Sequence, residues 1–437
     1  MRISIDNVVL LEPATEARTE GHLVIEDGVI REVSSSPVTN AEIRIDGRGK
    51  TVIPGLIDCH VHVTAATADF PALRRWSPAY TTVRALDILS AMTRRGFTTV
   101  RDAGGADWGL ARAIQEGHAV GPRLQYCGQA ISQTGGHGDM REPGDVVHEV
   151  CHCCAGLGRI ADGVSAVRHA CRDEIRRGAT HIKIMASGGV SSTTDRIDST
   201  QFSVEELCAA VEEAQAANIY VMAHAYTARA INRALESGIR SIEHGNYLDE
   251  SSCELFKSKN AFLVPTLATY YAMPREGLAA GLHASMVEKI GDTLDKGLQA
   301  LELAHRSGVS MAYGTDLLGA MQKWQLHEFA LRREVVGIGN ALRSATSDAA
   351  ELLCMEGSIG TLTLGACADL LVVDQDPLEK PDTLENLQQY LGHVMIDGKM
   401  QDDATYKQAQ VMLATAELIA GRDPEYAKLY GFDSGST

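Results

Sequence analysis

Eight short apolar runs, separated by segments of helical periodicity, constrain the fold of this 437-residue chain more than any other feature. Runs of this length are typical of buried strands, and helices between them are typical of strands that pair in parallel. The runs occupy residues 56–62, 98–102, 123–130, 181–186, 220–224, 241–244, 262–267 and 311–316. The alternation predicts an α/β protein built on a (β/α)8 TIM barrel, although a large doubly wound sheet would give a similar pattern.

Helix start and stop signals lie between these runs. Ser203 can cap a helix together with Glu206, and apolar residues then recur on one face. Helical stretches at 164–177 and 227–236 end near Gly178 and Gly238, as expected for helices that stop at a glycine. The order of strand, helix and strand is therefore supported by local signals as well as by hydropathy.

The two ends of the chain have a different pattern, with short alternating strands and tight turns. Asp27-Gly28 and Asp46-Gly47 each follow an alternating run, and this dipeptide favours hairpin turns. Strand and turn signals return at 368–374 and 393–398. Two β segments that bracket a long middle predict one small β-sandwich formed by both chain ends. The predicted domains are the sandwich at 1–53 plus 359–402, the barrel at 54–358, and a C-terminal helix and tail at 403–437.

Charge and hydropathy argue against two classes of partner. The net charge of −17 repels nucleic acid, and no basic patch interleaved with aromatic residues could neutralise phosphates. The N-terminus has no apolar signal core, and no uninterrupted apolar stretch is long enough to span a bilayer. We therefore expect a soluble cytoplasmic protein that binds neither nucleic acid nor membrane.

The ten cysteines are sparse for a chain of this length and irregularly spaced, which favours reduced thiols over a disulfide framework. The tightest group is Cys151-His152-Cys153-Cys154. Its donors are consecutive, whereas a chelating pair of cysteines normally has about two to four residues between its members. We interpret this group as a small structural cluster and not as a zinc site.

Metal-ligand residue types lie at or near the ends of five of the eight apolar runs, namely His60 and His62, Lys183, His224, His244 and Asp316. Two imidazoles at positions i and i+2 project from one face of a strand and can bind a single cation together. In a barrel, the carboxyl ends of the strands converge on one mouth, where active sites of this architecture lie. The sequence therefore predicts a metal centre to which all six residues contribute.

Lys183 is unexpected in such a set, because an ammonium group repels cations. Burial beside an apolar strand lowers the pKa of an amine, and a free amine can add carbon dioxide to form a carbamate. A carbamate is an anion with two oxygens, so it could bridge two metals. We predict His60, His62 and Asp316 on one divalent ion, His224 and His244 on the other, and carbamylated Lys183 between them.

A binuclear centre of this kind predicts hydrolysis. Metal binding can lower the pKa of water to about 7, which would give a bridging hydroxide at neutral pH. Asp316 is placed to take the proton of this nucleophile and to pass it to the departing amine nitrogen, while a metal polarises the scissile carbonyl. The predicted reaction is hydrolysis of an amide or another carbonyl derivative in a small-molecule substrate, with Asp316 and Lys183 as catalytic residues.

These residues resemble the binuclear amidohydrolase superfamily, through the Pro54-to-His62 segment, Lys183, His224, His244 and Gly314-Thr-Asp316. The resemblance spans nearly the whole chain. It implies a (β/α)8 barrel with a β-sandwich from both ends, two zinc ions, a carboxylated lysine at Lys183, and Asp316 as proton shuttle. Relatives are often homo-oligomers, so the resemblance also implies a homo-oligomer.

Three further segments, at 134–139, 181–189 and 224–226, look like the Xaa-Pro dipeptidase-like branch of that superfamily. Members of this branch act as dipeptidases or metallocarboxypeptidases on an amide next to a free carboxylate. Some cleave N-acyl amino acids, including the mycotoxin ochratoxin. The resemblance implies that His137 and Tyr226 face the substrate, whereas a loop histidine and a packing tyrosine are the structural alternatives. No arginine can be assigned to the substrate carboxylate.

The side-chain pocket and the reaction class leave alternatives open. Trp324, Tyr270 and Met273 could bind an apolar substrate group, although packing beneath long loops is the reading we favour. A cyclic-amide hydrolase of the dihydroorotase or hydantoinase kind would use the same metal set. An imidazolonepropionase-like enzyme or deaminase would lack the bridging lysine, and a non-enzymatic scaffold would typically lack ligands. Lys183 argues against an imidazolonepropionase-like enzyme or a deaminase. The complete set of candidate ligands argues against a scaffold.

Overall fold

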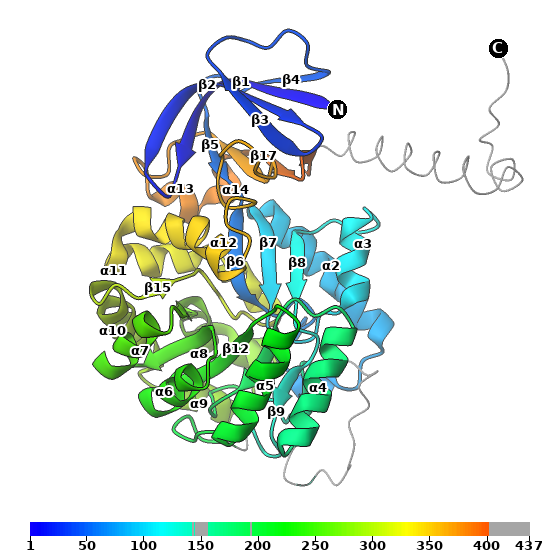
Figure 1. Ribbon diagram of the computed structural model, residues 1–437, viewed down its shortest axis with the longest axis vertical. Coiled ribbons are helices and arrows are strands. Elements are labelled where there is room, and N and C mark those ends of the chain that lie inside the picture. Colours follow the sequence, from blue (N-terminus) through cyan, green and yellow to red (C-terminus); the bar gives the residue numbers. More distant parts are fainter. Residues whose placement is uncertain (142–143, 145–155, 193–194, 402–437) are drawn as a thin grey trace, which may run out of the picture.

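The computed structural model describes residues 1–141, 144, 156–192 and 195–401 (Figure 1). The cysteine group at 151–154 and the predicted C-terminal helix and tail at 403–437 lie outside these residues. Within the described part of the chain, helices are too short or too polar to cross a membrane.

Parallel strands form the barrel in the middle of the chain. One sheet has three strands in the order β6-β7-β8, and a second has seven in the order β10-β9-β11-β12-β13-β14-β15. Their bounds are β6 (Leu56–Val61), β7 (Phe97–Asp102), β8 (Arg123–Tyr126), β9 (Ala130–Ser132), β10 (Gly158–Ile160), β11 (Ile182–Met185), β12 (Val221–Thr227), β13 (Ser241–Tyr247), β14 (Phe262–Val264) and β15 (Ser310–Met311). All eight predicted runs overlap a strand of the structure, the last of them only at Met311, and the predicted α/β barrel class is confirmed.

Backbone hydrogen bonds join the two sheets at both of their edges. On one side, Thr180 N donates to Tyr126 O over 2.9 Å, which links β8 to the residues before β11. On the other side, Cys59 N donates to Tyr313 O and Asp316 N donates to His60 O, each over 2.8 Å. The chain beyond β15 therefore lies against β6, and this contact closes the barrel between its last and first strands.

The third predicted strand, 123–130, differs from the structure because it is broken. β8 pairs with β7, and β9 pairs with β11, so the two halves serve different sheets. Gly128 lies between them with φ of +73°, a left-handed conformation that favours glycine. A Cβ at this position would also collide with the Glu174 carboxylate. The break is thus a backbone feature that only a glycine accommodates.

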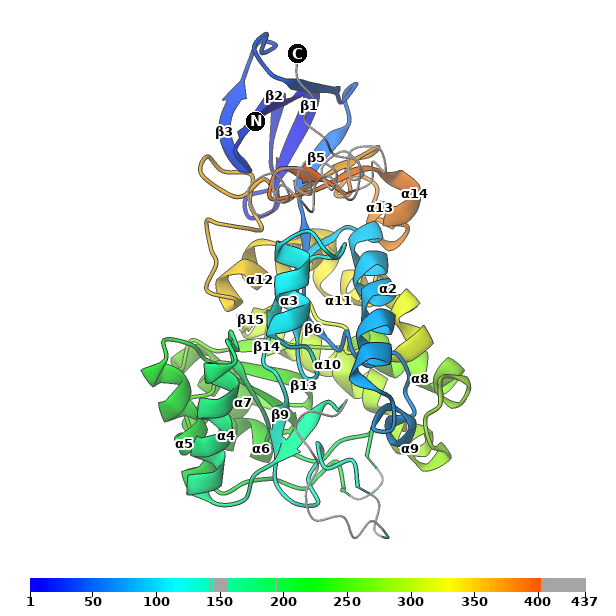
Figure 2. The ribbon, with the colours of Figure 1, turned by 90° about the vertical axis from the view of Figure 1, so that its right-hand side faces the viewer.

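Helices cover the outside of the barrel strands (Figures 1 and 2). The capping box predicted at Ser203 is present, since its side chain accepts from Glu206 N and the Glu206 carboxylate accepts from Ser203 N. The longer helices are α2 (Pro78–Arg94), α3 (Trp108–Gln115), α4 (Val164–Arg176), α5 (Val204–Ala216), α6 (Ala228–Glu236), α7 (Glu250–Ser258), α8 (Leu267–Ala280), α10 (Thr293–Arg306) and α11 (His327–Ser344). The shorter ones are α1 (Phe70–Leu73), α9 (Ala284–Ile290), η1 (Gly319–Trp324), α12 (Ser347–Leu352), α13 (Asp382–Glu385) and α14 (Leu387–Tyr390).

Strands from both ends of the chain form one eight-stranded sheet, which lies at the top of Figure 1. Its order is β18-β17-β16-β5-β1-β2-β3, with β4 paired to β1. The bounds are β1 (Arg2–Glu12), β2 (Ala17–Glu26), β3 (Val29–Ser34), β4 (Ile43–Asp46), β5 (Thr51–Pro54), β16 (Leu370–Val373), β17 (Leu391–Ile396) and β18 (Lys399–Met400). The two chain ends therefore share one β unit, while the two-layer sandwich and the domain boundaries stay predictions.

One of the two predicted hairpin turns is wrong. Asp27 and Gly28 both have positive φ and join the antiparallel strands β2 and β3, as predicted. Beyond Asp46, in contrast, β4 and β5 both pair parallel to β1 and not to each other. The positive φ values there fall on Arg48 and Gly49, two residues later than predicted. The alternating pattern identified the strand correctly but could not show which neighbour it pairs with.

Candidate metal centre and active site

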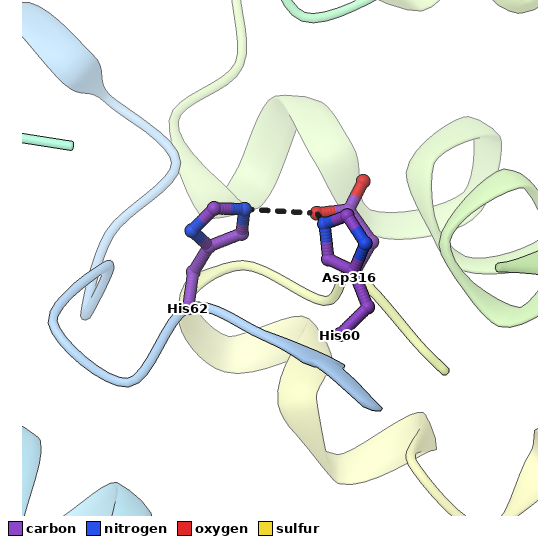
Figure 3. A group of neighbouring side chains, drawn as sticks. All are labelled: His60, His62 and Asp316. Carbon is purple, nitrogen blue, oxygen red and sulfur yellow. Dashed lines mark ion pairs between the residues drawn. The ribbon is translucent and has the colours of Figure 1, made fainter. Parts of the chain in front are cut away.

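Three of the predicted ligands meet where the first and last barrel strands join (Figure 3). His60 and His62 come from the end of β6, and their Nε2 atoms lie 3.4 Å and 3.2 Å from Asp316 Oδ1. One ligand atom from each residue lies within 4.8 Å of the other two. The hydrogen bond from Asp316 N to His60 O fixes this juxtaposition through the backbone.

His224 and His244 bring two more rings to the same place from β12 and β13. Their ring centroids are 4.5 Å apart, and the His244 centroid is 5.1 Å from that of His60. Burial lowers the pKa of both imidazoles well below the usual range of histidine. Both rings are therefore neutral at pH 7, which is the form that binds metal ions.

Each of the four histidines has one ring nitrogen engaged by the protein. His62 Nδ1 donates to Gly104 O, and His224 Nε2 donates to Gly188 O, each over 3.1 Å. His244 Nδ1 lies 2.8 Å from Thr266 Oγ1, and His60 Nδ1 lies 2.7 Å from Glu243 Oε2. A carbonyl or carboxylate partner accepts the ring N–H and leaves the opposite nitrogen of His60, His62 and His224 with its lone pair for a metal, whereas the Thr266 hydroxyl can donate or accept.

Lys183 is buried in β11, with 2% of its surface exposed, and it lines the same cavity as the histidines. Burial lowers the pKa of its amine, although the nearby charges of Glu243 and Asp316 oppose that shift. An amine with a lowered pKa is more often in the free form that reacts with carbon dioxide. The imidazoles and the carboxylate thus form a donor set that fits a divalent cation.

Asp316 and His244 both have left-handed backbone conformations, with φ of 52° and 73°. Non-glycine residues in this region are strained, and such strain is concentrated at functional sites. Burial raises the pKa of the Asp316 carboxyl, but His60, His62 and His244 outweigh it and hold that pKa well below its usual range. Asp316 is thus a carboxylate at neutral pH.

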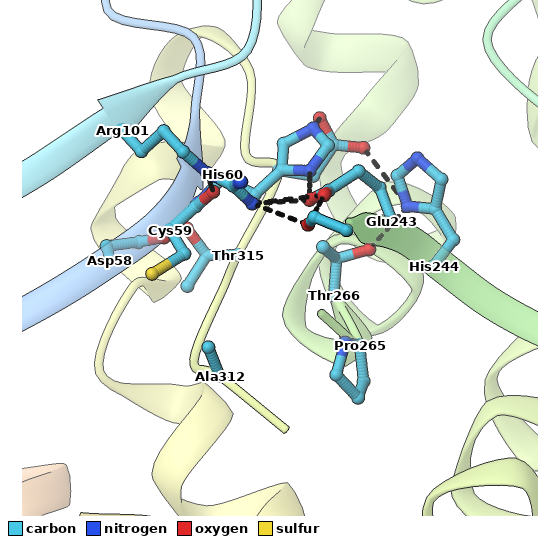
Figure 4. A network of polar contacts seen from close by, with 12 residues as sticks. Asp58, Cys59, His60, Arg101, Glu243, His244, Pro265, Thr266, Ala312 and Thr315 are labelled. Carbon is cyan, nitrogen blue, oxygen red and sulfur yellow. Dashed lines mark hydrogen bonds and ion pairs between the residues drawn. The ribbon is translucent and has the colours of Figure 1, made fainter. Parts of the chain in front are cut away.

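A charged network beneath the histidines was missed from the sequence (Figure 4). Arg101 in β7 and Glu243 in β13 are fully buried and lie 3.0 Å apart, Nη2 to Oε1. Burial raises the pKa of Glu243, but the Arg101 guanidinium and His60 outweigh it and keep that pKa well below its usual range. Charged residues are rarely fully buried unless paired. Two charges inside apolar strand runs were therefore a signal that could have identified them.

A cavity of about 830 Å³, counted with the solvent at its mouth, opens above the histidines. Its described lining includes all six predicted ligands and His137. The His137 ring stacks on His224 at 4.2 Å, and its Nδ1 lies 3.2 Å from Asp195 Oδ2. The remaining wall is largely apolar, with Phe70, Pro71, Met140, Leu157, Met185, Met286 and Leu318, beside Gly138 and the polar Asp139, Ser191 and Ser192.

Tyr226 and the predicted pocket residues lie outside this lining as far as the described residues define it. The Tyr226 ring stacks on His244, and its hydroxyl lies 2.6 Å from that of Tyr270. Tyr270 and Met273 are buried in an apolar cluster against which Trp324 packs. These three residues therefore belong to the packing of α8 and η1, which confirms the packing interpretation. No arginine is among the described lining residues.

Comparison with known proteins shows the family to which this chain belongs. Residues 51–400 match the profile of the Amidohydrolase family, which is most of the chain. The chain belongs to the Amidohydrolase family. The ochratoxinase of Aspergillus niger is 35% identical over 378 residues, covering 82% of this chain and 78% of that protein. This family membership makes the chain a hydrolase that acts on carbon–nitrogen bonds, and the scaffold reading is wrong.

Two solved structures are similar along almost their whole length. A prolidase in complex with N-methylphosphonate-L-proline superposes with a TM-score of 0.89 at 46% identity, covering 92% of this chain and 99% of that one. A Xaa-Pro dipeptidase with methionine bound in its active site gives a TM-score of 0.82 at 27% identity, again covering 92% and 99%. The predicted resemblance to the Xaa-Pro dipeptidase-like branch is thus confirmed.

Proposed function

We propose that this amidohydrolase uses a binuclear metal centre to cleave an amide or peptide bond next to a free carboxylate. Its substrates would be dipeptides, including Xaa-Pro, or N-acyl amino acids of the ochratoxin type. One observation carries the proposal: four histidines with one engaged ring nitrogen each surround a single cavity together with Asp316 and Lys183. Such a set suits two cations better than one, because a tetrahedral zinc site takes about four ligands.

In this proposal, residues from different strands would hold different zinc ions. His60, His62 and Asp316 would hold one ion, His224 and His244 the other, and the carbamate of Lys183 would contact both. When bound, the ions would lower the pKa of a water molecule and polarise the scissile carbonyl. Asp316 accepts the proton of the attacking water, because it is a carboxylate at the mouth of the barrel, and then donates that proton to the leaving amine nitrogen.

Substrate recognition would fall to His137 and the apolar wall of the cavity. His137 Nδ1 lies 3.2 Å from the Asp195 carboxylate, which would orient the ring at the cavity wall for contact with the substrate carboxylate. Phe70, Met140 and Met286 would contact an apolar group on the substrate. Tyr226 would act through the position of the His244 ring. The relatives named as prolidase and ochratoxinase act on substrates of this description, which supports the proposal.

A substrate panel tests this proposal. The purified chain, reconstituted with zinc, is assayed on Xaa-Pro, Xaa-Arg or Xaa-Lys dipeptides and on N-acyl aromatic amino acids. Each compound is paired with its C-terminal carboxamide, which has the same shape but no carboxylate. We expect turnover of an apolar acid and at least about a hundredfold lower kcat/KM for its carboxamide. Equal rates on the two, or hydrolysis of cyclic amides alone, would overturn the proposal.

A further inference from the structure

The four histidines of the metal centre are not held alike. Among the described residues, His62, His224 and His244 each face a neutral partner, either a carbonyl or a hydroxyl. Apart from Asp316, whose carboxylate lies near His60, His62 and His244, His60 alone in this set faces a carboxylate, with 2.7 Å between its Nδ1 and Glu243 Oε2. An ionised carboxylate only accepts hydrogen bonds, so the Nδ1 proton must lie on His60. The His60 Nε2 lone pair is then directed toward Asp316, 3.4 Å away.

Arg101 holds Glu243 from the opposite side. Its Nη2 donates to both carboxylate oxygens, over 3.0 Å and 3.2 Å, and its Nε donates to Cys59 O over 2.6 Å. Ser241 Oγ also donates to Glu243 Oε1. The guanidinium therefore connects β7 and the residue before His60 with β13, across the interior of the barrel (Figure 4). Every oxygen of Glu243 has at least two donors, so the carboxylate has one available orientation.

A buried ion pair of this kind adds little to stability, since desolvation offsets most of the attraction. Apolar side chains would fill the barrel interior as well. What the pair provides is a fixed negative charge against one side of one imidazole. Such a contact raises the basicity of the ring and holds its orientation, and its loss typically weakens metal affinity about 10–100-fold.

We propose that Glu243, oriented by Arg101, is a positioning residue that sets the affinity of the metal site formed by His60, His62 and Asp316. This inference rests on the proposed binuclear function. Because Glu243 bonds only one of the two histidine pairs, it predicts that the two metal sites respond unequally to its removal. Glu243 is not among the described residues that line the cavity.

The test compares Glu243→Gln with a matched control, Glu174→Gln. Glu174 is also a buried carboxylate paired to an arginine, with 2.8 Å between Arg159 Nη1 and Glu174 Oε1, but it lies in helix α4 and makes no hydrogen bond or ion pair with a histidine among the described residues. Zinc affinity is measured by chelator competition on the full chain, zinc content by elemental analysis, and site geometry by the visible spectrum of the Co²⁺ form. Thermal unfolding reports any general loss of stability.

We expect Glu243→Gln to keep one zinc tightly and to bind the second about 10–100-fold more weakly, with an altered Co²⁺ spectrum. Excess zinc should restore part of its turnover with little change in KM. Glu174→Gln should bind both ions with wild-type affinity, and Glu243→Asp should keep a charge and show a smaller loss. If Glu243→Gln fails to fold, Glu243→Asp carries the comparison. If the folded Glu243 variants bind zinc with the same affinity as the wild type and give the same Co²⁺ spectrum, the inference is overturned. If the unmodified protein itself binds fewer than two metal ions, the proposed function is overturned.

Discussion

Replacement of Lys183 by methionine should separate the metal-bridging role from any structural one. The methionine side chain fills nearly the same volume, and volume-conserving exchanges in a packed site usually change stability by less than about 1.5 kcal/mol. It also removes an amine whose pKa burial lowers, which relieves a desolvation penalty. We therefore expect the unfolding temperature of the zinc-free variant to match or exceed that of the zinc-free wild type.

The same exchange should abolish the bridge. Loss of the shared ligand removes the stabilisation that a second metal gives to the transition state, and about 4 kcal/mol of such stabilisation corresponds to about a thousandfold in turnover. Elemental analysis should find close to one zinc per chain. Lys183→Ala instead leaves a space beside the cavity, so a small carboxylate such as propionate should restore part of its activity. Two zinc ions per chain and wild-type turnover in Lys183→Met would refute the carbamate bridge.

Three further changes test other parts of the site and the barrel. Asp316→Asn should retain most of its zinc, because one oxygen ligand remains. Steady-state assays should show turnover reduced about 10²–10⁴-fold, since no carboxylate can carry the proton. Full turnover would exclude the shuttle role. Chelation of the wild type should abolish activity and lower the unfolding temperature, since zinc at about 1,000 times its Kd stabilises the folded state by about 4 kcal/mol, and re-addition of two equivalents should reverse both effects. Gly128→Ala should lower the free energy of unfolding by about 1–3 kcal/mol in denaturant titration, because φ is +73° at this residue. An unchanged free energy of unfolding would show that the break in the third strand tolerates a side chain.

The convergence of the six candidate ligands on one cavity could be predicted because these residues are conspicuous in sequence. Histidines at the ends of apolar runs stand out, and the geometry of a barrel brings such ends together without further information. Glu243 and Arg101 act on the same site but through a contact across the barrel interior, between strands far apart in the sequence. Hydropathy of single strands cannot show such a contact, although it could have flagged the charges themselves.

The fold was predictable in its order of elements and less so in its pairings. Apolar runs marked the strands, but the division of the third one depends on the backbone conformation of Gly128, which hydropathy does not report. The direction in which β4 pairs also depends on long-range contacts and not on its own pattern. Apart from Met185 in β11, the apolar wall of the cavity comes from α1, α9 and loops, which carry no periodic signal.

The junction between the last and first barrel strands has a consequence for how the protein is made. His60 and Asp316 are joined through their backbones, yet they lie far apart in the chain. A growing polypeptide displays the histidine pair of β6 long before the aspartate exists, so it can offer a cation only an incomplete set of donors. The complete site appears when synthesis has passed residue 316 and the ring of strands has shut. The proposed metal should therefore bind with its full set of ligands only after this closure between β6 and the chain beyond β15.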